Sequence, residues 1–274
     1  MNKITASEVN NLRKQTGAGM MDCKKALVES SGDFEKAIDI LRKKGQKIAA
    51  KRADRSASEG VVISTVSSSK NFGIIVSLNC ETDFVAKNED FIKLAHSIMD
   101  IAIKNETSTK EELCSLQFTN GKSIEDNILE QTGIIGEKLE LKLKSINAEY
   151  VSCYVHAGSR LASMVGFDKQ VNENIAKDVA MQIAAMNPIA IDKDSVSEET
   201  INKEIEIGKD LAKQEGKPEN MLDKIAIGRL NKFFKENTLL SQTFIKDSKM
   251  SVSNYIASNT DNAKVLLFER VGLS

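Results

Sequence analysis

The sequence has few of the residues that build metal centres, disulfide frameworks and nucleophilic active sites. Its 274 residues include two histidines, four cysteines, two prolines and no tryptophan. The cysteines are scattered without a Cys-x-x-Cys pair, which is typical of a reduced cytosolic chain rather than a disulfide framework. No His-Glu-x-x-His motif, Gly-x-Ser-x-Gly motif or clustered cysteine and histidine spacing occurs. We therefore expect no metal site, no catalytic residue and no enzymatic chemistry.

The sequence also lacks a dominant charge and a long apolar run. Its formal net charge is -1, so we expect no overall attraction to nucleic acid or to an anionic membrane. No apolar run approaches the roughly 18 residues that span a bilayer, and the N-terminal stretch MNKITASEVN has no signal-peptide core. No phosphate-binding loop motif is complete. These absences predict a cytoplasmic protein without a cofactor, a direct nucleic-acid partner or a membrane partner.

Three short helical segments are predicted in residues 1–45. Thr5 and Glu8 have the spacing of a capping box at the start of the first segment. Asp33 is placed to cap the third segment, and Gly45 is placed to end it. We expect the three helices to form a small bundle that is a domain of its own.

Residues 46–59 read QKIAAKRADRSASE and have no clear apolar face. Their content of alanine, serine and charge predicts a linker. Its basic residues are expected to form a solvated face rather than a nucleic-acid site, because the charge of the whole chain is balanced. These residues are Lys47, Lys51, Arg52 and Arg55.

From residue 60 onward, one pattern of elements occurs twice. GVVISTVSSSKNFGIIVSLNC predicts a β-hairpin, and the following EDFIKLAHSIMDIAIKN predicts a helix. EYVSCYVHAGSRLASMVGF and VNENIAKDVAMQIAAMN repeat that order further along the chain. The repeat predicts an α+β core with antiparallel sheets, divided into subdomains at residues 60–148 and 149–274.

A helical hairpin is expected within the second subdomain, at about residues 196–236. Ser195 and Glu198 have capping-box spacing, and GKP at 216–218 interrupts the helical pattern once. The apolar seam of the two helices is thin, so we expect the hairpin to protrude from the core.

Two pairs of apolar residues stand in polar surroundings. Met20 and Met21 point about 100° apart on a helix, so both cannot face one small core. One of them can be buried and the other exposed, or both can belong to a contact surface. Phe84 and Val85 lie within NCETDFVAKNEDF, between the first hairpin and its helix. Composition alone favours burial of Phe84 at this junction.

Two long motifs resemble the signature segments of the bacterial translation elongation factor Ts family. They are LRKQTGAGMMDCKKAL at 12–27 and NCETDFVAKNEDF at 79–91. IIGEKL at 134–139, YVHAGSRLASMV at 154–165 and EGKPENM at 215–221 are similar to further landmarks of the family, in the same order. The resemblance covers essentially the whole chain.

The resemblance implies a guanine-nucleotide exchange factor for elongation factor Tu. It also implies an N-terminal three-helix domain similar to ubiquitin-associated domains, a two-part α+β core and a protruding helical hairpin. Such a factor binds its GTPase partner in the GDP-bound and nucleotide-free states. The alternative is an adaptor that carries a ubiquitin-associated-like domain and has no exchange activity.

The resemblance assigns residues to these contacts. Residues expected to displace Mg²⁺ from the partner are Thr82, Asp83, Phe84 and Val85. Residues of the N-terminal domain expected to dock on the partner are Leu12, Arg13, Met20 and Met21. Residues that match landmarks of the contact made by the second core subdomain are Ile135, Gly136 and His156.

The roles of Asp83 and of the C-terminus stay open at this point. Asp83 can hold its loop through a capping hydrogen bond, or it can contact the partner directly. Many members of the family carry an extra helix after the last core strand, whereas this sequence stops at Ser274. We expect the contact of that helix to be absent or replaced.

Overall fold

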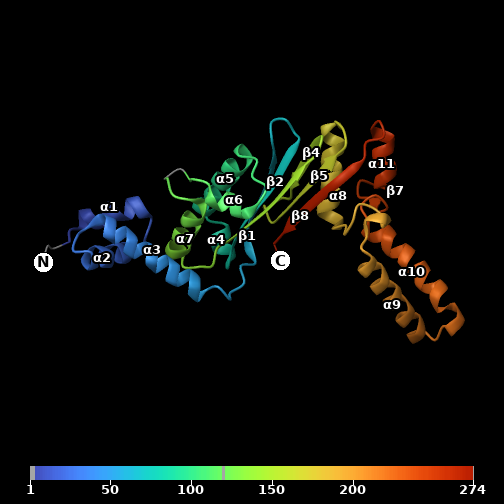
Figure 1. Ribbon diagram of the computed structural model, residues 1–274, viewed down its shortest axis with the longest axis horizontal. Helices are drawn as coiled ribbons and strands as arrows, with labels where there is room; N and C mark the ends of the chain where they lie inside the picture. Colours follow the sequence, from blue (N-terminus) through green and yellow to red (C-terminus); the bar gives the residue numbers. More distant parts are fainter. Residues whose placement is uncertain (1–3, 119–120, 274) are drawn as a thin grey trace.

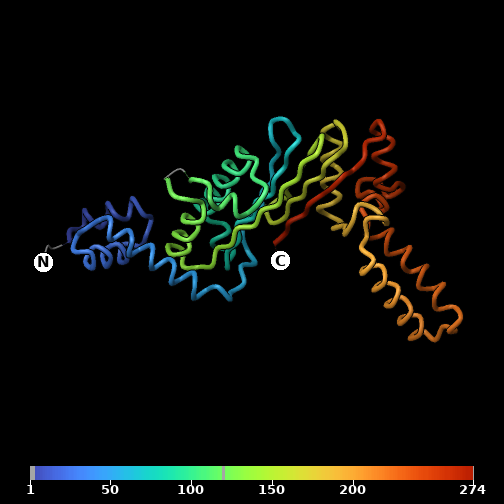
Figure 2. Tube along the Cα trace, in the orientation of Figure 1, coloured from blue at the N-terminus to red at the C-terminus, as the bar shows by residue number. Residues whose placement is uncertain are grey.

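The computed structural model describes residues 4–118 and 121–273, and the outer limits of the predicted domains, at residues 1 and 274, fall outside this part of the chain. Its architecture is α+β with small antiparallel sheets, as predicted. The molecule is elongated (Figures 1 and 2): a helical bundle lies at one end and a helical hairpin projects near the other. No helix within the described ranges is long and apolar enough to cross a membrane.

The N-terminal bundle consists of α1 (Ala6–Thr16), α2 (Met20–Glu29) and α3 (Phe34–Lys51). The predicted capping box is confirmed, since Thr5 N donates to Glu8 Oε2 at 2.7 Å and Glu8 N donates to Thr5 Oγ1 at 3.3 Å. Asp33 caps α3 by accepting a hydrogen bond from Lys36 N at 3.1 Å. The buried core of the bundle contains Val9, Leu12, Ala18, Cys23, Ala26, Leu27 and Ala37.

The predicted end of the third helix at Gly45 is wrong. Helix α3 continues to Lys51 and occupies residues 46–51 of the predicted linker. Gly45 marks a close crossing with α7 (Ile124–Ile135), because a Cβ atom at Gly133 would lie 2.8 Å from Gly45 Cα. The glycine therefore permits helix packing in place of a stop, and a continuous helix carries the bundle to the core.

The first core unit is an antiparallel sheet with the strand order β1-β2-β3. Its strands are β1 (Glu59–Val66), β2 (Phe72–Cys80) and β3 (Glu140–Asn147). The helices of this unit are α4 (Asp83–Ala86), α5 (Glu89–Lys104), α6 (Lys110–Ser115) and α7. Apolar residues on one face of the sheet form a continuous core with α5, as the period of its sequence predicts.

The second core unit is an antiparallel sheet with the order β4-β5-β8. Its strands are β4 (Tyr150–Val155), β5 (Leu161–Phe167) and β8 (Val265–Gly272). Helices α8 (Glu173–Met186) and α11 (Val252–Asn259) share its core, and a small ribbon is formed by β6 (Thr243–Phe244) and β7 (Asp247–Ser251). The two sheets pack together through a separate apolar cluster that contains Val62, Ile75, Ile146, Val151, Ala162 and Met164. The predicted repeat of a hairpin followed by a helix is thus confirmed.

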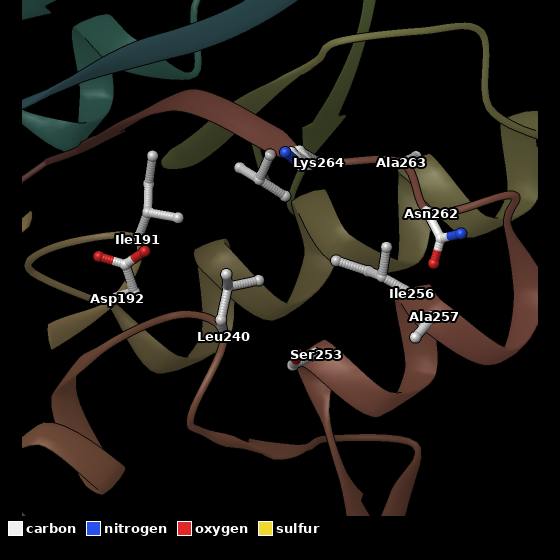
Figure 3. A pocket seen from close by; sticks show the side chains of 10 residues that line it. Ile191, Asp192, Leu240, Ser253, Ile256, Ala257, Asn262, Ala263 and Lys264 are labelled. Atoms are coloured by element: carbon white, nitrogen blue, oxygen red, sulfur yellow. The ribbon is translucent and has the colours of Figure 1, made fainter. Parts of the chain in front are cut away.

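A pocket lies at the end of the second unit, between α11 and the start of β8 (Figure 3). Its aliphatic lining includes Ile191, Leu240 and Ile256. Asp192 also lines it, but its carboxylate already accepts hydrogen bonds from the N–H and hydroxyl of Ser195 at 2.9 and 2.6 Å. The carboxylate of Asp192 is therefore already used to hold its own turn.

The helical hairpin is formed by α9 (Glu198–Gln214) and α10 (Leu222–Asn237), and it projects away from the sheets (Figure 1). Short 3-10 turns, Lys193–Ser195 and Glu219–Met221, precede its helices. The predicted capping box of Ser195 and Glu198 is wrong. Ser197 caps α9 by accepting from Thr200 N at 3.3 Å, because Ser195 is held in the preceding turn by Asp192.

Candidate functional site

Phe84 is the most exposed large apolar side chain among the described residues, with 83% of its surface accessible. The burial that composition favours is therefore wrong. Phe84 lies on the single helical turn of α4, and the side chains of the next two residues face the core. Val85 packs against the first core and Ala86 is buried, so Phe84 is left pointing outward.

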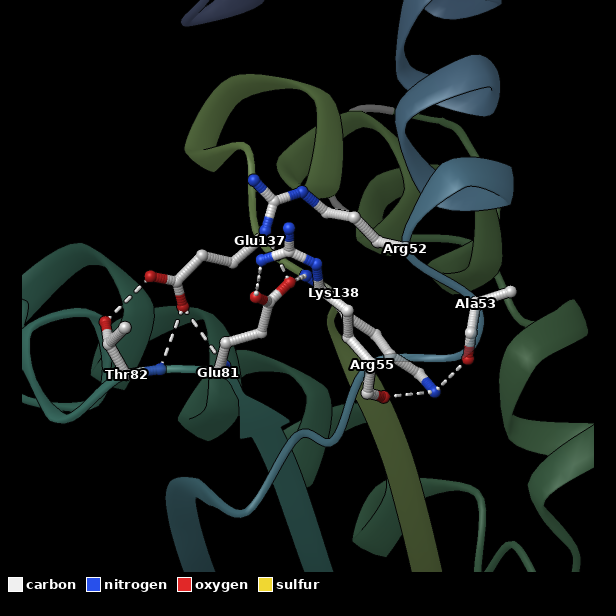
Figure 4. A network of polar contacts seen from close by, with 7 residues as sticks. All are labelled: Arg52, Ala53, Arg55, Glu81, Thr82, Glu137 and Lys138. Carbon is white, nitrogen blue, oxygen red and sulfur yellow. Dashed lines mark hydrogen bonds and ion pairs between the residues drawn. The ribbon is translucent and has the colours of Figure 1, made fainter.

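Thr82 begins α4 and is held by Glu137, which follows α7 (Figure 4). Thr82 Oγ1 accepts a hydrogen bond from Val85 N at 3.4 Å and donates one to Glu137 Oε1 at 2.7 Å. Glu137 Oε2 accepts from the backbone N–H groups of Glu81 and Thr82, each at 3.1 Å. The direction of α4 is thus fixed by a carboxylate from a distant part of the sequence.

Glu81, the residue before this cap, joins the loop to the end of α3. Its carboxylate accepts hydrogen bonds from Arg52 at 2.6 Å, Arg55 at 3.1 Å and the backbone N–H of Lys138 at 2.6 Å. Burial disfavours its charge, but these hydrogen bonds outweigh burial and lower the pKa of Glu81 to about 2. Arg52 and Arg55 are therefore ion-pair partners rather than a merely solvated basic face.

Asp83 does not supply the cap of α4, because Thr82 does so. Its carboxylate pairs with Lys87 Nζ one turn later, at 2.6 Å. The hydrogen bond from Lys87 holds the pKa of Asp83 below its usual value. The Asp83 side chain stays about half exposed, so it lies at the surface beside Phe84.

A pocket separates Phe84 and Val85 from the end of α7. Its opposite wall is formed by Ile134 and Ile135. Gly136 then ends α7 in the left-handed conformation, with φ 79°. The structure thus places Ile135 and Gly136 with the Thr82–Val85 segment, in the first core unit, and not with the second subdomain.

His156 lies in the exposed turn between β4 and β5, where its Nδ1 is 3.0 Å from the Tyr154 hydroxyl. This turn approaches the first unit, since Val62 N donates to Ser159 O at 2.7 Å. A second pocket lies between the turn and α4, with Asp83 and Arg160 in its lining. The turn of His156 is therefore close to the other flank of α4.

In the N-terminal bundle, Met20 and Met21 are both exposed, at 57% and 62%. The interpretation in which one of them is buried is wrong. Arg13 is exposed as well, whereas Leu12 is fully buried in the bundle core, where it supports the helices from within. Sequence reasoning missed Val28, an exposed residue of α2 seven positions after Met21, although that spacing places both on one helix face.

The predictions also missed the polar residues that hold α4, namely Arg52, Glu81, Glu137 and Lys138. Glu81 and Glu137 stand inside quoted motifs, so their position in NCETDF and IIGEKL was the available signal. Their pairing was not predictable from spacing, because residues 81 and 137 meet only through the packing of α7 beside the first sheet.

Comparison with known proteins places these motifs in a family. The sequence model described as "Elongation factor TS" matches residues 81–274. The chain is 55% identical to elongation factor Ts of Christiangramia forsetii and 50% identical to that of Flavobacterium psychrophilum, each over 100% of both chains. It is 46% identical to elongation factor Ts of Porphyromonas gingivalis, over 99% of this chain and 98% of the relative.

Proposed function

The chain belongs to the elongation factor Ts family, and from this premise we propose that it is a guanine-nucleotide exchange factor for elongation factor Tu. It binds the GDP-loaded GTPase, stabilises the nucleotide-free state and so promotes the release of GDP. It acts in the cytoplasm and forms no covalent intermediate with its partner.

The exposed side chain of Phe84 carries this proposal. An aromatic residue with 83% of its surface in water contributes little to the fold of its own chain. The cap of Thr82 nevertheless holds it in a defined direction, which is the arrangement of an anchor for a partner. We infer that the Thr82–Val85 segment enters the partner beside its Mg²⁺ and displaces the ion.

Mg²⁺ and backbone N–H groups hold the phosphates of a bound nucleotide in GTPases. An exchange factor must therefore bind the nucleotide-free partner more tightly than the loaded one, so that factor and nucleotide expel each other. Shifting such an equilibrium by about 10⁴-fold requires roughly 5.5 kcal/mol of differential binding. Burial of one phenylalanine supplies roughly 1.5–3 kcal/mol. Phe84 must then act together with a wider interface.

That wider interface contains the remaining predicted contact residues. Arg13, Met20 and Met21 form the docking surface of the bundle, with Leu12 supporting them from within. Ile135 and Gly136 extend the surface beside Phe84, and His156 contributes from the turn of the second unit. We propose the bundle (residues 1–45) and the subdomains at 60–148 and 149–274 as separate contact modules, joined by residues 46–59.

The test uses elongation factor Tu loaded with a fluorescent GDP and mixed with the protein in a stopped-flow instrument. The wild-type chain is expected to accelerate release. Phe84→Ala is expected to bind the partner but to release GDP at least about 10-fold more slowly, because it lacks the buried ring. Ile227→Ala is the matched control, since Ile227 is also an exposed large apolar residue but lies on the projecting hairpin.

An unchanged release rate with Phe84→Ala would contradict the proposed role of Phe84 in displacing Mg²⁺. If the wild-type protein bound GDP-loaded elongation factor Tu without any acceleration, the exchange function itself would be wrong, and the adaptor alternative would gain support.

A further inference from the structure

Glu137 lies after α7, yet its carboxylate binds the residues that begin α4 (Figure 4). Thr82 Oγ1 donates to it at 2.7 Å, and the backbone N–H groups of Glu81 and Thr82 donate at 3.1 Å. We propose that Glu137 is a positioning residue for nucleotide release, which fixes the direction in which α4 presents Phe84. This inference rests on the proposed exchange function and adds to it a residue outside the Thr82–Val85 segment.

The need for such a residue follows from the length of α4. A helix of only one turn, Asp83–Ala86, gains little from its own hydrogen bonds and depends on its cap and its neighbours. The single hydroxyl proton of Thr82 is directed at Glu137, which leaves an oxygen lone pair for Val85 N. Glu137 thereby fixes the rotamer that caps the turn carrying Phe84.

Glu137 also connects this turn to the N-terminal bundle. Several residues of α7 touch the bundle; among them, Gly133 crosses α3 at Gly45, and Ile134 packs against the bundle core. Gly136 ends the helix, and Glu137 follows directly. One short stretch therefore sets the position of Phe84 relative to Met20 and Met21. Contacts made by the docking surface can act on the nucleotide site only if that relation is maintained.

Geometry and charge can be separated by three substitutions at this position. Glu137→Gln removes the charge but keeps the reach, and its amide oxygen can still accept from both backbone N–H groups. Glu137→Asp keeps the charge but is one methylene shorter. Glu137→Ala removes all of the contacts. The positioning role depends on reach, so it predicts that Gln replaces Glu and that Asp does not.

The experiment measures release of fluorescent GDP from elongation factor Tu over a series of factor concentrations, which yields a maximal rate and a half-saturating concentration. Glu137→Asp and Glu137→Ala are expected to lower the maximal rate by about 10-fold to 100-fold, because a small displacement of a reacting contact has effects of that size. Glu137→Gln should stay within about threefold of the wild type, since its amide oxygen can accept from both backbone N–H groups and its amide nitrogen can donate to Thr82 Oγ1, which keeps a second lone pair for Val85 N.

A calorimetric titration with GDP-loaded elongation factor Tu, in excess GDP, supplies the second measurement. All three variants should retain the wild-type affinity for this state within about threefold, because the bundle and the second unit still dock before Phe84 reaches the nucleotide site. Glu140→Ala is the matched control, as Glu140 lies on the neighbouring strand β3 and pairs with Lys142 at 3.8 Å. Circular dichroism checks the fold, and the Asp and Gln variants carry the test if the Ala variant does not fold.

Several results would overturn the inference. One is a wild-type maximal rate in the Asp variant. Another is loss of rate with Gln and not with Asp, which would indicate charge in place of geometry. A fall in affinity that matches the fall in rate would indicate general damage. These results presuppose that the wild-type chain accelerates the release of GDP from elongation factor Tu. If it does not, the proposed function fails and this inference fails with it.

Discussion

The two core units pass from strand to helix in different ways. In the second unit, β5 ends at Phe167, which is fully buried, and α8 begins after the cap of Asn172. In the first unit, β2 ends at Cys80 and α5 begins after the cap of Asn88, but the one-turn helix α4 lies between them. Each junction carries a phenylalanine, and only Phe84 of the first is exposed.

The difference shows which contacts a junction needs when its aromatic residue is directed outward. In the second unit, the buried ring of Phe167 ties the junction to the core. Asp168 adds a hydrogen bond from Lys264 N at 2.8 Å. In the first unit, Phe84 contributes no such burial, and the carboxylates of Glu81 and Glu137 hold the chain in its place. An outward aromatic residue is thus combined with a polar scaffold.

The strongest way to break this comparison is to truncate both rings. Phe167→Ala should lower the free energy of unfolding by about 3–5 kcal/mol, because it leaves a cavity in a closed core. Phe84→Ala should change that free energy by less than about 0.5 kcal/mol, because the ring is already in water. Urea denaturation of both variants measures the two values.

Equal losses of stability would contradict the assignment of opposite roles to the two rings. The urea dependence of the unfolding free energy must be the same in both variants, since a change in slope would indicate an altered unfolded state.

Exposed methionines lie in the bundle and in the second unit, and comparing them tests which of these two regions docks on the partner. Met20→Asp combined with Met21→Asp should weaken the affinity for elongation factor Tu by about 2 kcal/mol or more, the scale of a buried interface anchor. The fold should tolerate the change, because acidic residues in the first turn of α2 suit the helix dipole. Calorimetric titration with the nucleotide-free partner gives the affinity.

Met186→Asp is the control for that experiment, since Met186 is also exposed but stands near the end of α8. An affinity that survives in the double variant, or that falls equally in the control, would exclude the bundle as the docking surface.

Much of the fold was predictable because it rests on local signals. The capping residues Thr5 and Asp33 and the repeated order of hairpin and helix are all confirmed. The errors arose where distant packing overrides a local rule. Gly45 has the chemistry of a helix end, yet α3 passes through it because α7 requires a close crossing there. Ser195 has the spacing of a cap, but Asp192 already binds it.

The candidate site was predictable to a smaller extent. Family motifs indicated Phe84 and the two methionines, whose side chains are exposed as a partner surface requires. Neither composition nor periodicity could indicate Glu137 as a partner of Thr82, because the contact depends on how α7 approaches the sheet. The placement of Ile135 beside Phe84 has the same origin.

A dependence on pH should distinguish the two junctions, because ion pairs to Glu81 hold the first, whereas the second rests on the buried ring of Phe167 and one backbone hydrogen bond to Asp168. The pKa of Glu81 is lowered from 4.5 to about 2 in the folded chain, where Lys138, Arg52 and Arg55 donate to its carboxylate. A group with a depressed folded pKa stabilises the fold fully above its unfolded pKa and loses that contribution as pH falls toward the folded value. The stabilisation by Glu81 is therefore present at neutral pH and declines between about pH 4.5 and pH 2.

Glu81→Gln should lower the free energy of unfolding by about 1.5–3 kcal/mol near neutral pH, the typical loss when a hydrogen-bonded charge is removed. The difference from the wild type should shrink steadily in urea titrations taken from about pH 5 down to about pH 3, because the Glu81 carboxyl of the unfolded wild type takes up a proton over this range while that of the fold stays largely ionised. Glu140→Gln serves as the control, since its carboxylate is more exposed and pairs weakly at 3.8 Å. A difference that stays constant across this range, or that grows with acid, would mean that the charge of Glu81 does not hold the first junction.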